Sequence, residues 1–282
     1  MGGLIGACLA RNGAQVTMVV RAASLPNYPH ELKLESPFGK VSVPVSVSAE
    51  VPAVDVLWLT VKATQLQESL TTIKNPGAVS AIVPLLNGID HIEFLRARYG
   101  RERVIPATIA VESERVAPGD FVHRSSFARL NVSSAGKSLL AETLDQLQKM
   151  GFECRFVDHE PTLMWSKLVF LGPFALTTTA ANQGTQEILS DPHWRELGMS
   201  CIREACAVAV AEGAHLNAEA VIAGLAKMPG NMRSSMQKDV EQGKAPELEA
   251  IAGPILRGAE RHRIAIPATK TLVAAVEARV RG

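Results

Sequence analysis

Apolar and polar positions follow two different periods in the first 158 residues of the chain. Short, nearly continuous apolar runs, "VDVLWLTV" and "AVSAIVPLL", are typical of strands that are covered on both faces. The run "QVTMVV" adds a third strand, and "TQLQESLTTI" has the composition and spacing of a helix. Such alternation of strands and helices predicts a parallel α/β sheet.

Other segments of this first part predict antiparallel pairing. The stretch "ELKLESPFGKVSVPVSVS" alternates with period two around a glycine, which predicts a hairpin. The stretch "VIPATIAVESERVAPGDFVHRSSFARLNVSS" predicts a β-meander. A helix, "SLLAETLDQLQKMG", ends at Gly151, and "ECRFV" follows as one more strand. We therefore expect a mixed sheet.

The pattern changes near residue 158, where the strand signals stop. The later segments have helical spacing, among them "EPTLMWSKLVFLGPFALTTTAA" and "HWRELGMSCIREACAVAVAEGA", and several begin with Pro, Asp or Asn, which suit helix starts. The sequence therefore predicts two domains, an α/β domain over residues 1–158 and an all-α domain over residues 159–282.

Composition narrows the class of protein. The 282 residues are enough for two cores, and a net charge of +1 without a basic block argues against a role driven by charge on nucleic acid or membrane surfaces. No apolar run reaches the ~18 residues of a membrane span, and the start lacks the pattern of a signal peptide. We expect a cytoplasmic protein that acts on a small molecule, with a homodimer left open.

The cysteines and histidines predict no metal or disulfide chemistry. The seven histidines are scattered, and no C-x-x-C pair occurs. Each cysteine lies in an apolar stretch, so all four are expected to be buried and reduced: Cys8, Cys154, Cys201 and Cys206.

The chain opens with "MGGLIGACLARNGAQVTMVVR", the pattern of a small-residue helix, a turn and a strand. Gly2, Gly6 and Ala10 share one helix face, which lets a helix pack closely on a sheet. In a Rossmann unit the last glycine of G-x-G-x-x-G has this role, and the helix N-terminus holds a pyrophosphate. Gly2 would then be the third glycine, with the first strand and the G-x-G turn upstream of Met1. The alternative is a helix whose small residues serve packing alone.

Polar residues follow three of the predicted strands. Ligands of open parallel sheets bind beyond the carboxyl ends of the strands, where this chain has Arg21, Lys62 with Gln65, and Asn87. An arginine after the second strand of such a fold can pair with the 2′-phosphate of NADP, whereas an acidic residue selects NAD. The alternatives are a solvated loop charge at Arg21, a helix-starting lysine at Lys62 and a plain Asn-Gly turn at Asn87.

The segment "TLMWSKLVFLGPF" places a lysine in an apolar helix. Leu163, Lys167, Leu171 and Phe174 share a face, and apolar residues fill most neighbouring positions. Burial lowers the pKa of a lysine unless an anion compensates, and such a lysine is a reasonable proton donor. The alternatives are a side chain that reaches the surface and a structural ion pair.

Candidate partners of this lysine come late in the chain, in "RSSMQKDVEQGKAPELEAI". They are Ser234, Ser235, Asp239, Glu247 and Glu249. Pro246 suits the first position of a helix and would put Glu247 in the first turn. The alternatives are helix capping for the serines and a favourable interaction with the helix dipole for Glu247.

Together these segments resemble the ketopantoate reductase (2-dehydropantoate 2-reductase) family, in order and over essentially the whole chain. The opening segment is similar to the glycine helix and NADP-selecting arginine of the family. The segments "VKATQ", "LLNGID", "MWSKLVF" and "SSMQKDVEQGKAPELE" resemble its V-K-A-x-Q, N-G, W-x-K and S-S-M-x-x-D segments. The resemblance implies a Rossmann-like domain that binds NADP(H), followed by a helical domain of the 6-phosphogluconate dehydrogenase type that carries substrate and catalysis.

The resemblance also implies roles for individual residues. It makes Lys167 the general acid, Glu247 its acidic partner and Asn87 a neighbour of the lysine and the nicotinamide. It implies a contact from Ser235 to the substrate carboxylate, for which Arg233 and Asn231 are further candidates. The implied cofactor contacts are Gly2, Gly3, Arg21, Lys62, Gln65 and Asn87.

The sequence departs from the family pattern at polar positions. Many members have asparagines four and eight residues after the lysine, where this chain has Leu171 and Ala175, and another asparagine is replaced by Met232. We therefore expect NADPH-dependent reduction of ketopantoate or of a related, less polar 2-oxo acid or ketone. One alternative is a binding or sensor protein with an incomplete cofactor loop. Another is a hydroxyacid or 6-phosphogluconate dehydrogenase, against which the "SSM" segment argues.

Overall fold

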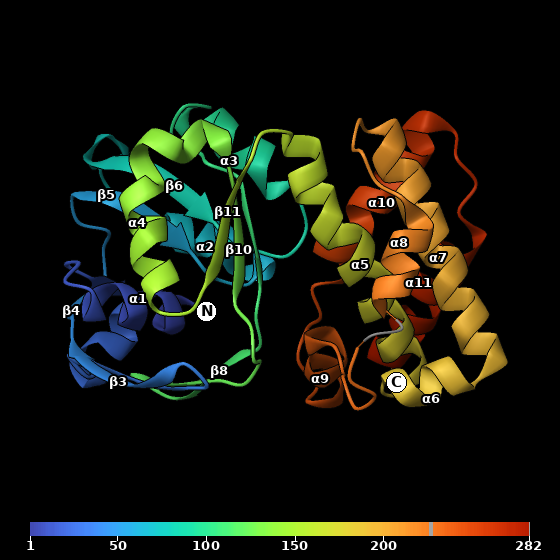
Figure 1. Ribbon diagram of the computed structural model, residues 1–282, viewed down its shortest axis with the longest axis horizontal. Coiled ribbons are helices and arrows are strands. Elements are labelled where there is room, and N and C mark those ends of the chain that lie inside the picture. The colour runs from blue at the N-terminus through green and yellow to red at the C-terminus, as the bar shows by residue number, and fades with distance from the viewer. Residues whose placement is uncertain (226–227, 282) are drawn as a thin grey trace. The chain divides into compact units, whose positions relative to one another are not determined.

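The computed structural model describes residues 1–225 and 228–281, and its internal contacts divide the chain into two compact units. Unit 1 comprises Met1–Leu86 and His91–Asp158, and unit 2 comprises Asn87–Asp90 and His159–Gly282. Unit 1 mixes helices and strands and unit 2 is helical, so the predicted fold class, an α/β part followed by an all-α part, is confirmed (Figure 1).

The three apolar runs form strands β1 (Thr17–Val19), β5 (Val54–Leu59) and β6 (Val79–Pro84) of unit 1, all in parallel pairs, but the partner of β1 comes from the stretch predicted as a hairpin. The first pair is β1 with β4 (Ser46–Ser48), and the second is β5 with β6. Strand β6 is buried at most positions, whereas most of β5 is only half-buried. The expectation that both strands are covered on both faces is therefore wrong for β5, which pairs with β6 alone among the described strands.

The helix predicted between β5 and β6 is shorter than its pattern. Helix α2 covers Leu66–Leu70, and a 3₁₀ turn over Ala63–Gln65 precedes it. A second helix, α3 (His91–Tyr99), lies between β6 and the following strands.

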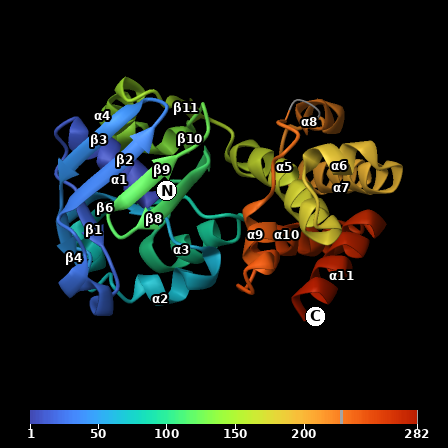
Figure 2. The ribbon, with the colours of Figure 1, turned by 90° about the horizontal axis from the view of Figure 1, so that it is seen from below.

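The predicted hairpin belongs to a four-stranded mixed sheet. Strands β2 (Glu31–Ser36) and β3 (Gly39–Pro44) are antiparallel around Gly39, whose φ of +123° favours glycine. Strand β2 pairs in parallel with β9 (Asp120–His123), which is antiparallel to β8 (Ser113–Ala117). The resulting order is β3-β2-β9-β8, and these strands lie side by side in Figure 2.

The predicted meander is wrong, because its strands divide between two sheets. Strand β7 (Ala107–Ala110) is antiparallel to β10 (Arg129–Ser133), and β10 is parallel to β11 (Glu153–Val157). The intervening β8–β9 hairpin pairs instead with β2, where Phe121 is buried in the core. The alternating pattern identified the strands correctly, but it carries no information on which neighbour each strand takes.

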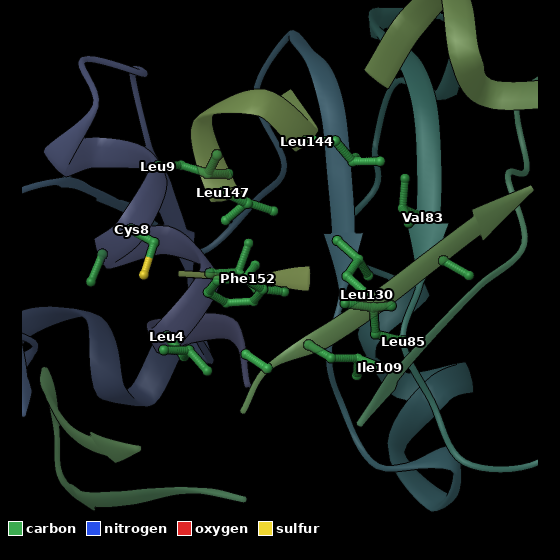
Figure 3. Close-up of a cluster of buried hydrophobic side chains, with 14 of the residues drawn as sticks. Leu4, Cys8, Leu9, Val83, Leu85, Ile109, Leu130, Leu144, Leu147 and Phe152 are labelled. Carbon is green, nitrogen blue, oxygen red and sulfur yellow. The ribbon is translucent and has the colours of Figure 1, made fainter. Parts of the chain in front are cut away.

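Helices α1 (Gly2–Arg11) and α4 (Lys137–Lys149) complete the core of unit 1. Figure 3 shows their apolar side chains among those of strands and connecting loops, including Leu4, Leu9, Leu147, Phe152 and Leu130. Helix α4 ends just before Gly151, the residue at which the sequence predicted its end. The φ of Gly151 is +92°, a left-handed conformation that favours glycine.

Helix α1 packs closely on its surroundings through its first residues. A Cβ atom at Gly3 would collide with the ring of Phe121, and one at Gly2 would lie 2.6 Å from Oγ1 of Thr60, the residue after β5. A Cβ atom at Gly6 would make only ordinary contacts, at 3.4 Å. The close approach expected from the spacing of Gly2, Gly6 and Ala10 is therefore made by Gly2 and Gly3.

Unit 2 is built around α5, which contacts several of the other helices, among them α7, α10 and α11. Its buried residues lie on most sides of the helix, as expected for an apolar segment inside a helical domain. No strand occurs in the described part of residues 159–281. The helices are α5 (Glu160–Ala181), α6 (Thr185–Ser190), α7 (Pro192–Ala211), α8 (Ala218–Leu225), α9 (Ser235–Glu241), α10 (Leu248–His262) and α11 (Pro267–Arg281).

The cysteines are free thiols, and all four lie in the described residues. Cys8, Cys201 and Cys206 are buried, but Cys154 is only half-buried, which corrects the expectation for that residue. Burial raises the pKa of Cys8 and of Cys154 to about 12, so these groups remain thiols at neutral pH.

None of the helices within residues 1–225 and 228–281 combines the length and apolar character needed to cross a membrane. The same residues contain no group of three or more His, Cys, Asp or Glu side chains suited to hold a metal ion.

Candidate active site

A buried carboxylate with an amide partner lies at the start of α10. Asn87, in the short segment after β6, donates a hydrogen bond from Nδ2 to Oε2 of Glu247 at 2.9 Å. Glu247 is only 7% exposed. It precedes the helix, which begins at Leu248, so the expectation that Pro246 begins the helix with Glu247 in its first turn is wrong. The backbone of Glu247, at φ −81° and ψ 39°, is not yet helical.

Lys167 lies near the middle of α5, where its side chain is partly buried among apolar residues. Desolvation lowers the pKa of Lys167 from 10.5 to about 8, and the negative charge of Glu247 opposes this shift. The lysine is therefore mostly protonated at pH 7 and gives up its proton far more readily than an exposed lysine does. Three residues of unit 2 are thus connected: the charge of Glu247 acts on Lys167, and the amide of Asn87 donates a hydrogen bond to Glu247.

The residues that follow Lys167 on its face of α5 are apolar. Leu171 is partly buried and Ala175 is buried, and neither side chain has a hydrogen-bonding group. The rings of Phe170 and Phe174 lie 6.2 Å apart between their centroids and are nearly parallel, with 23° between planes. This part of the helix presents hydrocarbon rather than amide groups.

The two serines of the late segment differ in their surroundings. Ser234 is buried and caps α9, accepting a hydrogen bond from the backbone N–H of Gln237 at 3.1 Å. The Oγ1 atom of Thr178 also donates to Ser234 Oγ at 2.8 Å. Ser235 is exposed as the first residue of α9. Capping, the alternative interpretation of the serines, therefore describes Ser234 and leaves the Ser235 hydroxyl accessible.

The other carboxylate-contact candidates, Arg233 and Asn231, are also exposed. Arg233 forms an ion pair with Glu241 at the end of α9. The hydrogen bond of Ser234 joins this segment to α5 at Thr178, which is eleven residues after Lys167, or roughly 16 Å along the helix.

The cofactor candidates other than Asn87 lie in unit 1. Arg21, two residues after β1, is exposed and pairs with Glu68, with Nε and Oε1 3.3 Å apart. Lys62 follows β5 and precedes the 3₁₀ turn that ends at Gln65, and both side chains are partly buried. Gly2 and Gly3 begin α1.

The sequence interpretation missed a charged group around the Asn87 segment. Arg257, on α10, forms ion pairs with Asp90 and with Glu249. Asp90 directly follows the Asn-Gly pair and Ile89, and Glu249 and Arg257 lie on one helix, so the individual charges were visible. Their pairing was not, because Asp90 and Arg257 are 167 residues apart in the chain.

Comparison with known proteins matches both parts of the chain to one family. Residues 1–136 match the family model described as "Ketopantoate reductase PanE/ApbA", and residues 161–280 match its C-terminal counterpart. A "2-dehydropantoate 2-reductase" of Caulobacter vibrioides is 30% identical over 289 residues, which cover 99% of this chain and 95% of that protein. These matches favour an oxidoreductase over a binding or sensor protein.

Solved structures share the fold. A 2-dehydropantoate 2-reductase from Geobacter metallireducens superposes with a TM-score of 0.86 at 24% identity, covering 98% of this chain and 95% of that one. The ternary structure of D-mandelate dehydrogenase with NADH and anilino(oxo)acetate also gives a TM-score of 0.86, at 22% identity, with coverage of 100% and 96%.

Proposed function

Because the chain belongs to the ketopantoate reductase family, we propose that it reduces a 2-oxo acid to the 2-hydroxy acid with NADPH, using Lys167 as general acid. The observation that carries this proposal is the arrangement of a lysine in the apolar helix α5 with a buried carboxylate, Glu247, that accepts a hydrogen bond from Asn87. Desolvation lowers the pKa of this lysine to about 8, and the charge of Glu247 opposes the shift. A proton donor works best when its pKa lies near the operating pH, and this lysine meets that condition.

Each of these three residues has a distinct part in the proton transfer. When bound, NADPH supplies a hydride to the carbonyl carbon of the substrate. The electron pair of the C=O double bond moves to the oxygen, which takes a proton from Nζ of Lys167, and the neutral amine later regains a proton from water. Glu247 keeps the ammonium form populated, and Asn87 orients the Glu247 carboxylate through its hydrogen bond.

The residues of unit 1 fit a nicotinamide dinucleotide in two respects. The last glycine of the dinucleotide motif allows a helix to pack closely on a strand. Gly2 and Gly3 allow the same close approach of α1, to Thr60 and Phe121 respectively. The exposed Arg21 follows a parallel strand and has a carboxylate partner that an incoming phosphate can replace. We propose Lys62 and Gln65, beyond β5, as further contacts.

We propose Ser235, with Arg233 and Asn231 beside it, as contacts of the substrate carboxylate. This requires the segment to approach Lys167 more closely than its contact at Thr178, roughly 16 Å along α5 from the lysine, because the carboxylate is bonded to the carbonyl that Lys167 protonates. All three side chains are exposed, and a hydroxyl, a guanidinium and an amide are suitable donors to a carboxylate. The hydrocarbon of Leu171 and Ala175 supports a less polar substrate side chain than that of ketopantoate.

A matched pair of substrates tests the proposed reaction. Ketopantoate and 3,3-dimethyl-2-oxobutanoate differ only in one hydroxyl, and turnover of each is followed by NADPH absorbance. We expect both to be reduced, with kcat/KM for the compound without the hydroxyl at least as high, because Leu171 and Ala175, four and eight residues after Lys167, offer no hydrogen bond to that group. A preference for ketopantoate above about 100-fold would contradict the less polar substrate, since sites built to bind a hydroxyl discriminate at least this strongly. No reduction of any 2-oxo acid with NADPH or NADH would contradict the proposed function.

The choice of cofactor is tested by Arg21→Ala. We expect KM for NADPH to rise about tenfold to a hundredfold, because charge-assisted hydrogen bonds to the 2′-phosphate are lost, with KM for NADH nearly unchanged. Arg11→Ala, which removes another exposed arginine at the end of α1, is the control and should change neither value. Equal changes for both cofactors in Arg21→Ala would show that this arginine does not select NADPH.

A further inference from the structure

We propose that the ion pair between Asp90 and Arg257 is a positioning device that holds the Asn87–Asp90 segment on α10 and so keeps Asn87 aimed at Glu247. This inference rests on the proposed function of Asn87, Lys167 and Glu247. It assigns Arg257 and Asp90 to the reaction as positioning residues, since they act through Asn87 rather than on the substrate.

The Asn87–Asp90 segment is attached to unit 2 at each of its residues. Asn87 donates to Glu247 at one end, and Asp90 pairs with Arg257 at the other. Between them, Ile89 packs against the apolar cluster that contains Trp165 and Leu168 of α5. By its contacts the segment belongs to unit 2, although the chain on both sides of it belongs to unit 1. A stretch of four residues therefore depends on these contacts for its conformation.

Gly88 brings the segment against the backbone of α10. Its φ is +82°, and a Cβ atom there would collide with the carbonyl oxygen of Ala250. Ala250 and Arg257 are seven residues apart, which puts them on one face of the helix. Gly88 and Asp90 thus both contact that face of α10. The contact of Asn87, with Glu247, lies just before the helix begins.

The sequence of α10 leaves room for the guanidinium group. A Cβ atom at Gly253 would lie 2.6 Å from one terminal nitrogen of Arg257 and 2.8 Å from the other. The absence of a side chain at Gly253 lets the guanidinium lie across the helix, where one terminal nitrogen donates to Asp90 and the other to Glu249. A planar guanidinium that donates to two carboxylates is held in one orientation. The ammonium group of a lysine would reproduce this arrangement only in part.

The pair is suited to positioning rather than to stability. The side chains of Arg257 and Asp90 are 46% and 55% exposed, and ion pairs at such sites add little to the stability of a protein. Their loss should leave the helical core intact while it frees the Asp90 end of the segment. The effect then appears in the orientation of Asn87 and in kcat, not in folding.

The test is a double-mutant cycle with a spectroscopic readout. Arg257→Ala is expected to lower kcat about three- to fivefold, because an ion pair between half-exposed side chains contributes no more than this. KM for NADPH should change by no more than the same factor, because Asn87 is only one of the proposed cofactor contacts. Arg257→Lys should recover part of the loss. In an Asn87→Ala background, Arg257→Ala should have no further effect, because its action passes through Asn87. Arg261→Ala, which breaks an ion pair with Glu212 one turn along the same helix, is the matched control and should behave as the wild type.

The second readout does not depend on activity. In ¹⁵N-labelled protein the side-chain amide signal of Asn87, identified as the one missing in Asn87→Ala, should shift in Arg257→Ala and stay in place in Arg261→Ala. An unchanged signal in Arg257→Ala, or losses in kcat that multiply in the double variant, would overturn the inference. If the wild type reduced no 2-oxo acid, the proposed function would fail, and the amide signal would still decide whether Arg257 positions Asn87.

Discussion

Lys167→Ala is expected to lower kcat for reduction of a 2-oxo acid by about 10²- to 10⁴-fold, the usual contribution of a general acid. The affinity for NADPH, measured by fluorescence titration, should remain close to that of the wild type, because the proposed cofactor contacts other than Asn87 lie in unit 1. Lys149→Ala, on the exposed face of α4, removes a lysine that the mechanism does not use and should leave kcat unchanged. Normal turnover in Lys167→Ala would contradict the assigned proton donor.

A second substitution separates charge from proton transfer at this position. Lys167→Arg keeps a positive charge, but a guanidinium does not give up its proton in the accessible pH range. We expect kcat to stay low in this variant. If arginine restored most of the activity, the role of residue 167 would be to stabilise negative charge on the oxygen rather than to donate a proton.

The pH dependence of the wild type follows from the same group. Below pH 8 Lys167 is mostly protonated and competent to donate, and above pH 8 it is mostly neutral. Because kcat/KM reports the groups of the free enzyme, kcat/KM for reduction should fall as the pH rises through about 8. A lysine with its ordinary pKa of 10.5 would sustain the reaction well into the alkaline range. The measured position of this decline therefore tests the desolvation of Lys167 directly.

Much of the fold could be predicted from the sequence because apolar periodicity reports which face of an element is buried. The parallel pair β5–β6, the hairpin β2–β3 and the long helix α5 all have patterns of this kind. Strand pairing is different, since alternation is the same whichever neighbour a strand takes. The departure of β8–β9 from the predicted meander shows that limit: burial of Phe121 depends on β2, which is distant in sequence.

The candidate site divides in the same way. Lys167 stands out locally, because a charged residue in an apolar helix is unusual whatever surrounds it. Asn87 and Glu247 are each ordinary in their local context, and their hydrogen bond joins positions 160 residues apart. A family resemblance could connect them because it carries long-range information that a single pattern lacks. The Asp90–Arg257 pair had neither signal and was found only in the structure.

Glu247→Gln is expected to produce the second large effect, and one that depends on pH. The amide keeps the size of the side chain and an oxygen that can accept from Asn87, so the geometry of the site should persist while the negative charge is lost. The charge of Glu247 opposes the effect of desolvation on Lys167, so its loss lowers the pKa of Lys167 further. The decline of kcat/KM should therefore move to lower pH.

The size of the Glu247→Gln effect distinguishes an electrostatic role from a structural one. We expect kcat/KM to fall roughly five- to fiftyfold at pH 8 and to recover toward the wild-type value as the pH is lowered, because acid restores the protonated lysine. Glu260→Gln, an exposed position later in α10, serves as the control and should keep the wild-type profile. A loss of activity that was the same at every pH would mean that Glu247 supports the shape of the site but does not set the protonation of Lys167. The pH profile, rather than the activity at one pH, is thus the measurement that ties the buried carboxylate to the proton donor.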